Sequence, residues 1–126
     1  MPKQILILDD SATIRSVLQV YLMDLRLEFI EAADGETALQ MLGKTAIDLV
    51  ITDVKMAPMD GLTFLKRVRE SPNPAIARVP VLMLTGDKSP EVRKQGVLYG
   101  ADDFLLKPIK QEQLLVTVRR LLEKSS

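Results

Sequence analysis

Five short apolar segments alternate along this chain with segments of helical periodicity, and this alternation constrains the fold more than any other feature. The apolar segments begin near Ile5, Leu27, Leu49, Val81 and Phe104. The first, third and fourth are almost wholly apolar, as is typical of strands in a sheet covered by helices on both faces. Between them, apolar residues recur at helical spacing. The pattern predicts an α/β fold with a doubly wound, five-stranded parallel sheet of order 2-1-3-4-5, flanked by five helices.

The expected helices follow from periodicity and from start and stop signals. Ser11 is placed to cap the first helix, and Gly43 to end the second. Three prolines predict an open connection before the fourth strand. The fourth helix has a poor apolar stripe with an internal glycine. The expected helices are Ala12–Leu25, Glu36–Leu42, Leu62–Glu70, Pro90–Tyr99 and a final helix around Leu114–Leu122. With no break in composition, residues 1–126 are expected to form one domain.

Composition excludes several classes of function. The 17 Lys and Arg balance the 17 Asp and Glu, so the chain has no basic excess to attract nucleic acid or an acidic membrane surface. It has no Cys and no His, which excludes a disulfide framework, a thiol nucleophile and the usual zinc or copper ligands. Only hard cations with oxygen ligands remain as plausible metals. The first apolar run is too short for a signal sequence or a membrane span, so we expect a cytoplasmic protein.

Polar residues stand where four of the predicted strands end. Asp9-Asp10 follow the first strand and Asp53 ends the third, while Thr85-Gly86 and Lys107-Pro108 follow the fourth and fifth. In a parallel sheet the carboxyl ends of the strands lie on one edge, where ligands bind. We therefore expect three carboxylates, a hydroxyl and an ammonium group to meet there.

That set of groups suits a divalent cation and a phosphoryl group. Carboxylates in one crevice repel each other until they gain a proton or a cation, and Mg²⁺ prefers a few carboxylates together with water and phosphate oxygens. A carboxylate can then attack phosphorus as a nucleophile. Lys107 would neutralise the phosphoryl oxygens and Thr85 could donate a hydrogen bond to one of them. Gly86, which lacks a Cβ, would leave the approach to Thr85 open.

These motifs together resemble a response-regulator receiver domain, a flavodoxin-like signalling domain of two-component systems. The resemblance covers essentially the whole chain and keeps the family's order of motifs. It is carried by Asp9-Asp10-Ser11, by Asp53 in Asp-Val-Lys-Met-Ala-Pro-Met-Asp-Gly, by Leu84-Thr85-Gly86 and by Gly-Ala-Asp-Asp-Phe-Leu-Leu-Lys-Pro at 100–108.

The resemblance implies a role for each site residue. Asp53 is the expected phosphoacceptor. Mg²⁺ (or Mn²⁺) is expected on Asp10 and Asp53 directly, with Asp9 assisting through water and Lys55 supplying its backbone carbonyl. Thr85 is the expected switch hydroxyl, Lys107 the phosphate-pairing lysine and Phe104 the switch aromatic. The bond before Pro108 is expected to be cis.

Two positions depart from the family's pattern, and two others invite a separate hypothesis. Ala57 stands where the family commonly has Pro, and Pro58 follows it; the switch aromatic is Phe, which has no hydroxyl for a partner to read. Lys55 and Asp87 each lie two residues beyond a site residue and carry opposite charges. The resemblance implies that these positions flank the entrance and tune how fast water removes the phosphoryl group, and their opposite charges predict a pair across the mouth of the site.

The function implied is that of a signalling domain, and not that of an enzyme in its own right. A histidine kinase or a histidine phosphotransfer protein would donate the phosphoryl group, docking near Ile14 and Pro108-Ile109. An unidentified protein target would read the surface formed by Pro90–Tyr99, the strand with Phe104 and the last helix. No direct nucleic-acid or membrane partner is expected.

Three alternatives stay open at the level of sequence. A phosphorylation-independent binding module of the same fold would lack metal binding or phosphoryl transfer. An aspartyl phosphatase of the haloacid-dehalogenase type needs Asp-x-Asp at its first strand end, whereas this chain has Asp9-Asp10-Ser11. A flavodoxin-type cofactor binder would need aromatic stacking and a phosphate loop rich in Ser, Thr and Gly, and this chain has no Trp.

Overall fold

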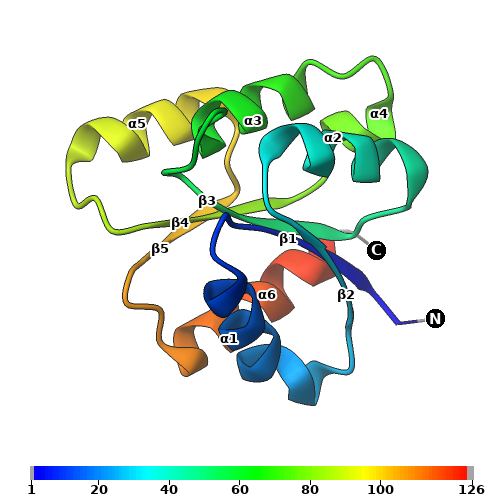
Figure 1. The fold of residues 1–126 in the computed structure, drawn as a ribbon, viewed down its shortest axis with the longest axis vertical. Coiled ribbons are helices and arrows are strands. Elements are labelled where there is room, and N and C mark those ends of the chain that lie inside the picture. Colours follow the sequence, from blue (N-terminus) through cyan, green and yellow to red (C-terminus); the bar gives the residue numbers. More distant parts are fainter. Residues whose placement is uncertain (1, 125–126) are drawn as a thin grey trace.

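The computed structural model describes residues 2–124 and contains a single five-stranded parallel sheet (Figure 1). The strand order is β2-β1-β3-β4-β5, which confirms the predicted fold class. Every neighbouring pair of strands is parallel, so all carboxyl ends lie on one edge. The strands are β1 (Gln4–Leu8), β2 (Glu28–Ala32), β3 (Leu49–Asp53), β4 (Val81–Thr85) and β5 (Asp103–Leu106).

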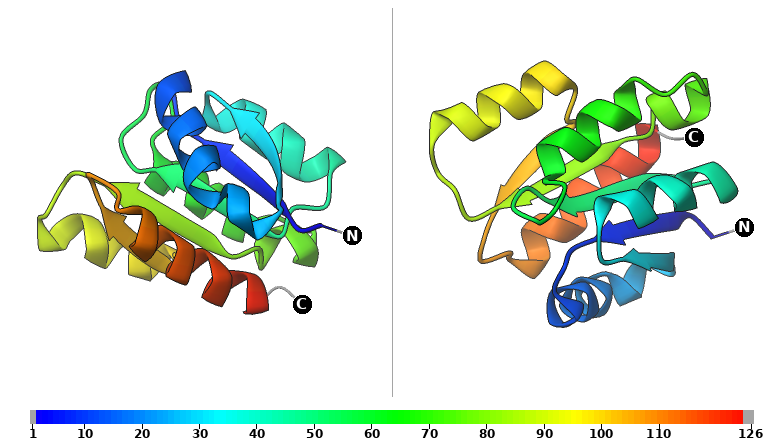
Figure 2. Two further views of the ribbon diagram at one scale, coloured as in Figure 1. Left: turned by 90° about the horizontal axis from the view of Figure 1, so that it is seen from below. Right: turned by 45° about the horizontal axis from the view of Figure 1, so that its top comes forward.

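Helices cover both faces of the sheet and make a three-layer sandwich (Figures 1 and 2). One layer contains α1 (Ala12–Leu22), the short 3₁₀ helix η1 (Met23–Leu25) and α6 (Gln111–Lys124). The other contains α2 (Gly35–Lys44), α3 (Gly61–Arg69), α4 (Pro74–Ala77) and α5 (Pro90–Tyr99). Within the described residues, no helix combines the length and apolar character needed to cross a membrane.

The sheet separates two apolar cores, because successive side chains of a strand point to opposite faces. Leu6, Val50 and Met83 pack beneath α2, α3 and α5, whereas Ile7 and Ile51 pack beneath α1 and α6. All five residues of β3 and all five of β4 are buried. The central strands therefore hold the carboxyl edge of the sheet in fixed positions.

Three helices next to the carboxyl edge begin at side-chain caps. Ser11 Oγ accepts a hydrogen bond from Ile14 N, Asp34 Oδ1 from Thr37 N, and Asp60 Oδ1 from Thr63 N. These bonds satisfy backbone donors that the first helical turn leaves free. They also fix where α1, α2 and α3 leave the loops of this edge.

Some predicted boundaries were wrong. The second helix does not end at Gly43 but continues to Lys44, with Thr45 at its C-cap. The first α-helix ends at Leu22 and tightens into η1. The three prolines predict an open connection before β4, but this connection contains the four-residue helix α4. Pro74 stands in the first turn of that helix, and Asn73 caps it. Proline is tolerated there since it lacks only an N–H that has no helical partner.

Candidate functional site

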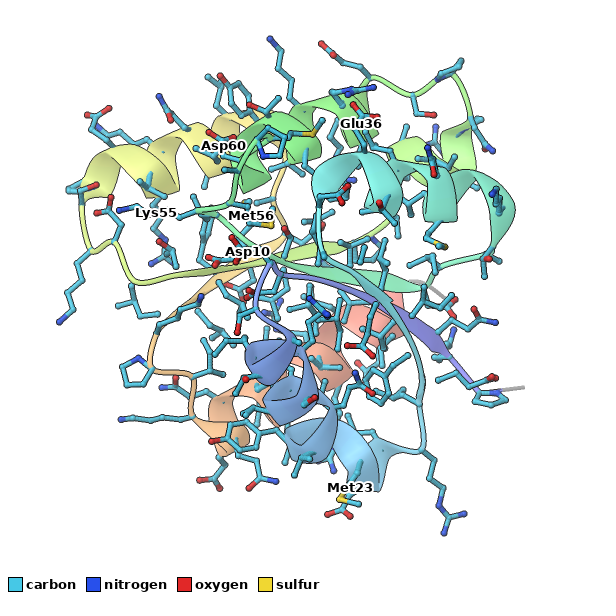
Figure 3. The ribbon with its side chains drawn as sticks, in the orientation of Figure 1. Asp10, Met23, Glu36, Lys55, Met56 and Asp60 are labelled. Carbon is cyan, nitrogen blue, oxygen red and sulfur yellow. The ribbon has the colours of Figure 1, made fainter. Side chains whose placement is uncertain are left out.

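Asp9, Asp10 and Asp53 lie together at the carboxyl edge of the sheet, and Figure 3 shows Asp10 just beyond the end of β1. One carboxylate oxygen of each lies within 4.8 Å of the others. Asp53 ends β3, the neighbour of β1, which is why residues 44 positions apart in sequence can meet. Asp9 and Asp53 are buried, whereas Asp10 is exposed. The cluster is therefore buried where Asp9 and Asp53 lie and open to solvent at Asp10.

Asp9 is only 2% exposed, and its two carboxylate oxygens differ. Oδ1 accepts a hydrogen bond from Ser11 N at 2.9 Å. Oδ2 is buried and has no hydrogen-bond partner among the described residues. Burial is the main cause that raises the pKa of Asp9, and the charge of Asp53 adds to it. A buried carboxylate with one free oxygen is costly unless a cation or a proton reaches it.

Lys107 is the cation nearest this cluster. Its Nζ lies 2.9 Å from Asp53 Oδ2 and 3.8 Å from Asp9 Oδ2. Its backbone N–H donates to the Thr85 carbonyl oxygen at 2.8 Å, which fixes the start of the loop after β5. The peptide bond between Lys107 and Pro108 is cis. A single ammonium group, carried by the loop after β5, therefore faces two buried carboxylates at the ends of β3 and β1.

The residues of the cluster fit a hard divalent cation. All three candidate ligands are carboxylates, and oxygen is the donor that Mg²⁺ and Mn²⁺ prefer. Asp9 Oδ2 supports the same conclusion: among the described residues it has no hydrogen-bond partner, and its only cation is Lys107, which it shares with Asp53. A cation here would supply positive charge to both the carboxylates and an incoming phosphate oxygen.

Thr85 ends β4 on the other side of Asp53 and is buried. Its Oγ1 accepts a hydrogen bond from Asp87 N at 2.9 Å. Beside it, a Cβ built on Gly86 would have no atom within 4 Å, so the space next to this residue is open. Asp87 Oδ1 accepts from Ser89 N at 2.8 Å, and this bond is the main cause that lowers the pKa of Asp87.

Lys55 lies on the loop after β3, near Asp10 and Met56 in Figure 3, with its side chain exposed. Its backbone N–H donates to Asp53 Oδ1 at 3.3 Å. Its charge contributes to lowering the pKa of Asp87, although the salt bridges among residues 2–124 include no direct pair between the two. The charges of Lys55 and Asp87 therefore interact through space without forming a direct ion pair.

Gly61 anchors the end of this loop against β3. Its N–H donates to the Val54 carbonyl oxygen at 2.8 Å. A Cβ on Gly61 would overlap the Asp53 carbonyl oxygen and lie 2.9 Å from Val54 Cα. The first turn of α3 can therefore approach the strand that carries Asp53 only because residue 61 has no side chain. The loop between them, in which Ala57 replaces the usual Pro, contains a second cis bond at Ala57-Pro58.

Phe104 packs inward from β5 and is 8% exposed. Its ring lies against Gly96 of α5, where an added Cβ would overlap Phe104 Cζ and lie 2.7 Å from Cε2. The guanidinium carbon of Arg93 stands 5.4 Å from the ring centroid. The aromatic ring is therefore enclosed between the sheet and α5.

Sequence reasoning missed Arg15, which contacts the same edge from α1. Its Nη1 donates to the Asp9 carbonyl oxygen at 2.6 Å and its Nε to Glu31 Oε1 at 2.9 Å. These contacts join the first turns of α1 to the end of β1 and to β2. The only signal in the sequence is a lone basic residue one turn after the Asp9-Asp10 pair, which periodicity alone assigns to a solvated helix face.

Comparison with known proteins places this geometry in one family. Residues 5–119 match the response regulator receiver domain family. The chemotaxis protein CheY4 of Vibrio cholerae superposes with a TM-score of 0.88 at 38% identity, over 96% of this chain and 99% of that one. The signal receiver domain of an HD domain-containing protein from Pseudomonas fluorescens gives a TM-score of 0.90 at 29% identity, over 99% and 98% of the two chains.

Two curated relatives that match essentially the whole of this chain are about twice as long as it is. Response regulator MprA of Mycobacterium sp. strain KMS is 35% identical over 126 residues, which is 100% of this chain and 53% of the relative. Transcriptional regulatory protein TrcR of Mycobacterium tuberculosis is 33% identical over 125 residues, which is 99% of this chain and 47% of the relative. The chain therefore spans about half the length of these relatives.

Proposed function

Because this chain belongs to the response regulator receiver family of two-component systems, we propose that it accepts a phosphoryl group on Asp53. The family is a signalling fold and not a family of catalytic enzymes in itself. In the proposed step a carboxylate oxygen of Asp53 attacks the phosphorus of a phosphohistidine. The new O–P bond forms as the N–P bond breaks, and the imidazole nitrogen leaves with the electron pair of that bond. Residues 1–126 would form the whole receiver domain.

The observation that carries this proposal is the position of Asp53. It ends the central strand β3 next to two other carboxylates, and one ammonium group lies 2.9 Å from it. Phosphoryl transfer depends largely on positioning and on charge stabilisation. Both need a rigid support, which the fully buried β3 gives.

We assign the divalent cation to Asp10 and Asp53, with Asp9 assisting through water and the Lys55 carbonyl completing the protein ligands. Mg²⁺ or Mn²⁺ bound there would offset the repulsion between the carboxylates and an approaching phosphoryl group. Asp9 gains most from this charge, since its Oδ2 is buried without a hydrogen-bond partner among the residues described. The exposed Asp10 leaves the entrance open to water and phosphate oxygens.

We assign Thr85 and Lys107 to the phosphoryl oxygens and Phe104 to the response. Lys107 already contacts Asp53 and would pair with a phosphoryl oxygen bound to it. The Thr85 hydroxyl would donate to another oxygen, next to Gly86. Thr85 ends β4, the neighbour of the strand that carries Phe104, so a shift of Thr85 would change the space available beside β5. Phe104 would respond by changing its packing against α5.

Two surfaces are proposed for the partners. A histidine kinase or histidine phosphotransfer protein would dock over α1, where Val17 and Val20 are exposed, close to Ile14 and Pro108-Ile109. A downstream protein target would read the face formed by α5, β5 and α6, where four large apolar side chains are exposed. Those side chains are Val97, Leu98, Leu106 and Val116.

Lys55 and Asp87 are proposed to slow the loss of the phosphoryl group by obstructing the attacking water. The Lys55 charge acts on the Asp87 carboxylate across the mouth of the site. An exposed pair of this kind adds little to stability, so its substitution should leave the fold intact. Either Lys55→Ala or Asp87→Ala should shorten the lifetime of the phosphorylated protein, and unchanged decay in both variants would refute the role.

Intact mass spectrometry after incubation with Mg²⁺ and acetyl phosphate tests the phosphoacceptor directly. We expect one added phosphoryl group in the wild type and none in Asp53→Asn or in the wild type with EDTA. An adduct in both proteins would mean that another aspartate is the acceptor. No adduct in a wild type that binds Mg²⁺ would favour a phosphorylation-independent protein-binding module of the same fold.

A further inference from the structure

Arg15 brings a second cation to the acid cluster, from the side opposite Lys107. It lies in the second turn of α1, and its side chain is only 15% exposed. Unlike Lys107, whose ammonium faces carboxylate oxygens, Arg15 donates to a backbone oxygen, that of Asp9, at 2.6 Å. The two cations next to the cluster therefore make different kinds of contact.

The Asp9 carbonyl belongs to the peptide unit that joins Asp9 to Asp10. On the other side of Asp9, its N–H donates to the Ala32 carbonyl oxygen at 3.1 Å. Arg15 thus completes a set of bonds that holds the backbone of Asp9 on both sides. Because the peptide unit is planar, fixing its oxygen also fixes the direction in which Asp10 leaves the strand.

Arg15 is itself held in place by β2. Its Nε donates to Glu31 Oε1 at 2.9 Å. Glu31 is the residue before Ala32, so one segment of β2 contacts Asp9 twice, once directly and once through the guanidinium group. Arginine suits this position because its planar group offers several donors in a fixed geometry.

Charge and position predict opposite effects of Arg15 on a bound cation. A positive group beside the cluster repels a divalent cation, so by charge alone its removal should strengthen metal binding. If Arg15 instead holds the Asp9–Asp10 peptide in place, its removal should weaken binding, as the loss of an outer partner of a metal ligand does. The sign of the change therefore separates the two roles.

We propose that Arg15 is a positioning residue for the divalent-cation site, which it serves by holding the Asp9–Asp10 peptide through its contact with the Asp9 carbonyl oxygen. This inference rests on the proposed function of Asp9, Asp10 and Asp53. Arg15 itself touches neither the cation nor the phosphoryl group.

The test is the affinity for Mn²⁺, measured by the loss of the free-ion signal in electron paramagnetic resonance. Arg15→Met removes the charge and the donors but keeps an unbranched apolar stem. We expect it to weaken Mn²⁺ binding by about tenfold, the lower end of the range for outer partners of metal ligands. Arg15→Lys keeps the charge but loses the forked geometry, and we expect a smaller loss of affinity.

Two control variants remove a positive charge elsewhere. Lys107→Met takes a cation away from the carboxylates themselves and should tighten Mn²⁺ binding. Arg69→Met removes a half-buried structural arginine that contacts Gly100, Val79 and Asp102, away from the cluster. It should lower the stability of the fold and leave the Mn²⁺ affinity unchanged. Circular dichroism at the temperature of the titration shows that each variant is folded.

Unchanged or tighter Mn²⁺ binding by Arg15→Met would overturn the inference while leaving the proposed function intact. An equal loss of affinity in Arg69→Met would also overturn it, because general loosening would then explain the effect. If the wild type binds no Mn²⁺, the metal site itself is wrong and both proposals fail. The behaviour of the wild type therefore distinguishes a failure of the proposed function from a failure of the inference.

Discussion

Phe104 keeps its inward position because residue 96 of α5 has no side chain. The ring rests where a Cβ on Gly96 would stand, and the guanidinium carbon of Arg93, one turn earlier in the same helix, lies 5.4 Å from the ring centroid. Gly96 is also the only buried residue of α5. The contact between these two residues is thus the closest link between α5 and the strand that leads to Lys107.

Substitution of Gly96 by Ala should force Phe104 out of its present position. An added methyl group would overlap the ring, and overpacking of this kind costs about 1–3 kcal/mol. We expect the free energy of unfolding in urea to fall and the nuclear Overhauser contacts between the Phe104 ring and α5 to weaken. An outward ring in the Gly96→Ala protein would show that the space at residue 96 decides the position of Phe104.

Gly43 provides the matched control, since a Cβ there would meet no atom within 4 Å. It lies in α2, so Gly43→Ala should raise the free energy of unfolding by about 0.5–1 kcal/mol through helix propensity alone. A Gly96→Ala protein that gains stability to the same extent, with the ring contacts intact, would show that Phe104 does not depend on the space at residue 96.

At the level of the elements, α5 buries fewer residues than any of the other long helices, α1, α2, α3 and α6. One of its ten residues is buried, whereas α6 buries four. Its N-cap Ser89 makes no side-chain capping bond, in contrast to the caps of α1, α2 and α3. An element with few buried contacts costs little free energy to displace. The proposed target surface thus includes the helix that can move most easily.

Hydrogen exchange should make this difference visible. We expect the amides of α5 to exchange through local openings of low free energy, and those of β3 and α6 to exchange only near the free energy of global unfolding. Native-state exchange followed by nuclear magnetic resonance measures both in one sample. Protection of α5 equal to that of β3 would contradict the idea that α5 is the easily displaced element.

Arg69 ties the end of α3 to the amino edge of the sheet. Its guanidinium group donates to the carbonyl oxygens of Gly100, Ala77 and Val79 and to Asp102 Oδ2. Burial lowers the pKa of Arg69, while the charge of Asp102 and its hydrogen bond oppose that effect. One side chain thus holds α3, the end of α4 and the C-terminus of α5 together.

Arg69→Met should lower the free energy of unfolding by about 2–4 kcal/mol, because it leaves several carbonyl oxygens and a carboxylate without their donor. Urea denaturation measures the loss. Arg69→Lys keeps the charge but cannot serve so many acceptors, and it should recover only a small part of the stability. Full recovery by lysine would show that charge, and not the forked geometry, joins these elements.

Sequence reasoning predicted the strands and the order of the elements because apolar runs and helical periodicity are local signals. The predicted helix boundaries were wrong where one residue type is compatible with two local structures. Gly43 was interpreted as a helix end, yet the helix passes through it and ends at Lys44. Pro74 was interpreted as part of an open connection, yet it begins α4 after the Asn73 cap. In both cases the deciding factor is the packing and capping of the neighbouring residues, which a pattern of residue types does not show.

For the whole molecule, topology explains why the carboxylate cluster was predictable and the contact of Arg15 was not. Once the sheet order is known, the ends of β1 and β3 must be neighbours, so Asp9 and Asp53 must meet. The contact of Arg15 with Glu31 depends instead on the rotation of α1 over the sheet and on the extension of a long side chain. The rule that the carboxyl ends of parallel strands share one edge of the sheet does not predict such a contact.

The carboxylate cluster that serves the proposed function should also weaken the metal-free fold. Burial raises the pKa of Asp9, so the folded protein holds that proton more tightly than the unfolded chain does. The contribution of Asp9 to the free energy of unfolding therefore falls as the pH rises from about 4 through its folded-state pKa, and it levels off when Asp9 is ionised in both states. At neutral pH without metal, we therefore expect the buried charge of Asp9 to destabilise the folded state.

Asp9→Asn should remove this penalty. In EDTA at pH 7 we expect the variant to be more stable than the wild type, because the amide of Asn has the size of the carboxylate but carries no charge to be buried. The advantage should shrink as the pH falls toward 4, where wild-type Asp9 is protonated. Urea denaturation of both proteins across this pH range gives the difference directly, and other carboxylates common to the two proteins cancel from it.

Adding Mg²⁺ should reverse the order of stability. A ligand at a concentration of 100 times its dissociation constant stabilises the folded state by about 2.7 kcal/mol. The wild type should gain this amount, whereas Asp9→Asn, which lacks one of the three carboxylates, should gain less at the same Mg²⁺ concentration. A variant that is less stable than the wild type in EDTA would show that the Asp9 carboxylate supports the fold through Ser11 more than its buried charge opposes it. The affinity of the site for a cation would then not be linked to a loss of stability in the metal-free protein.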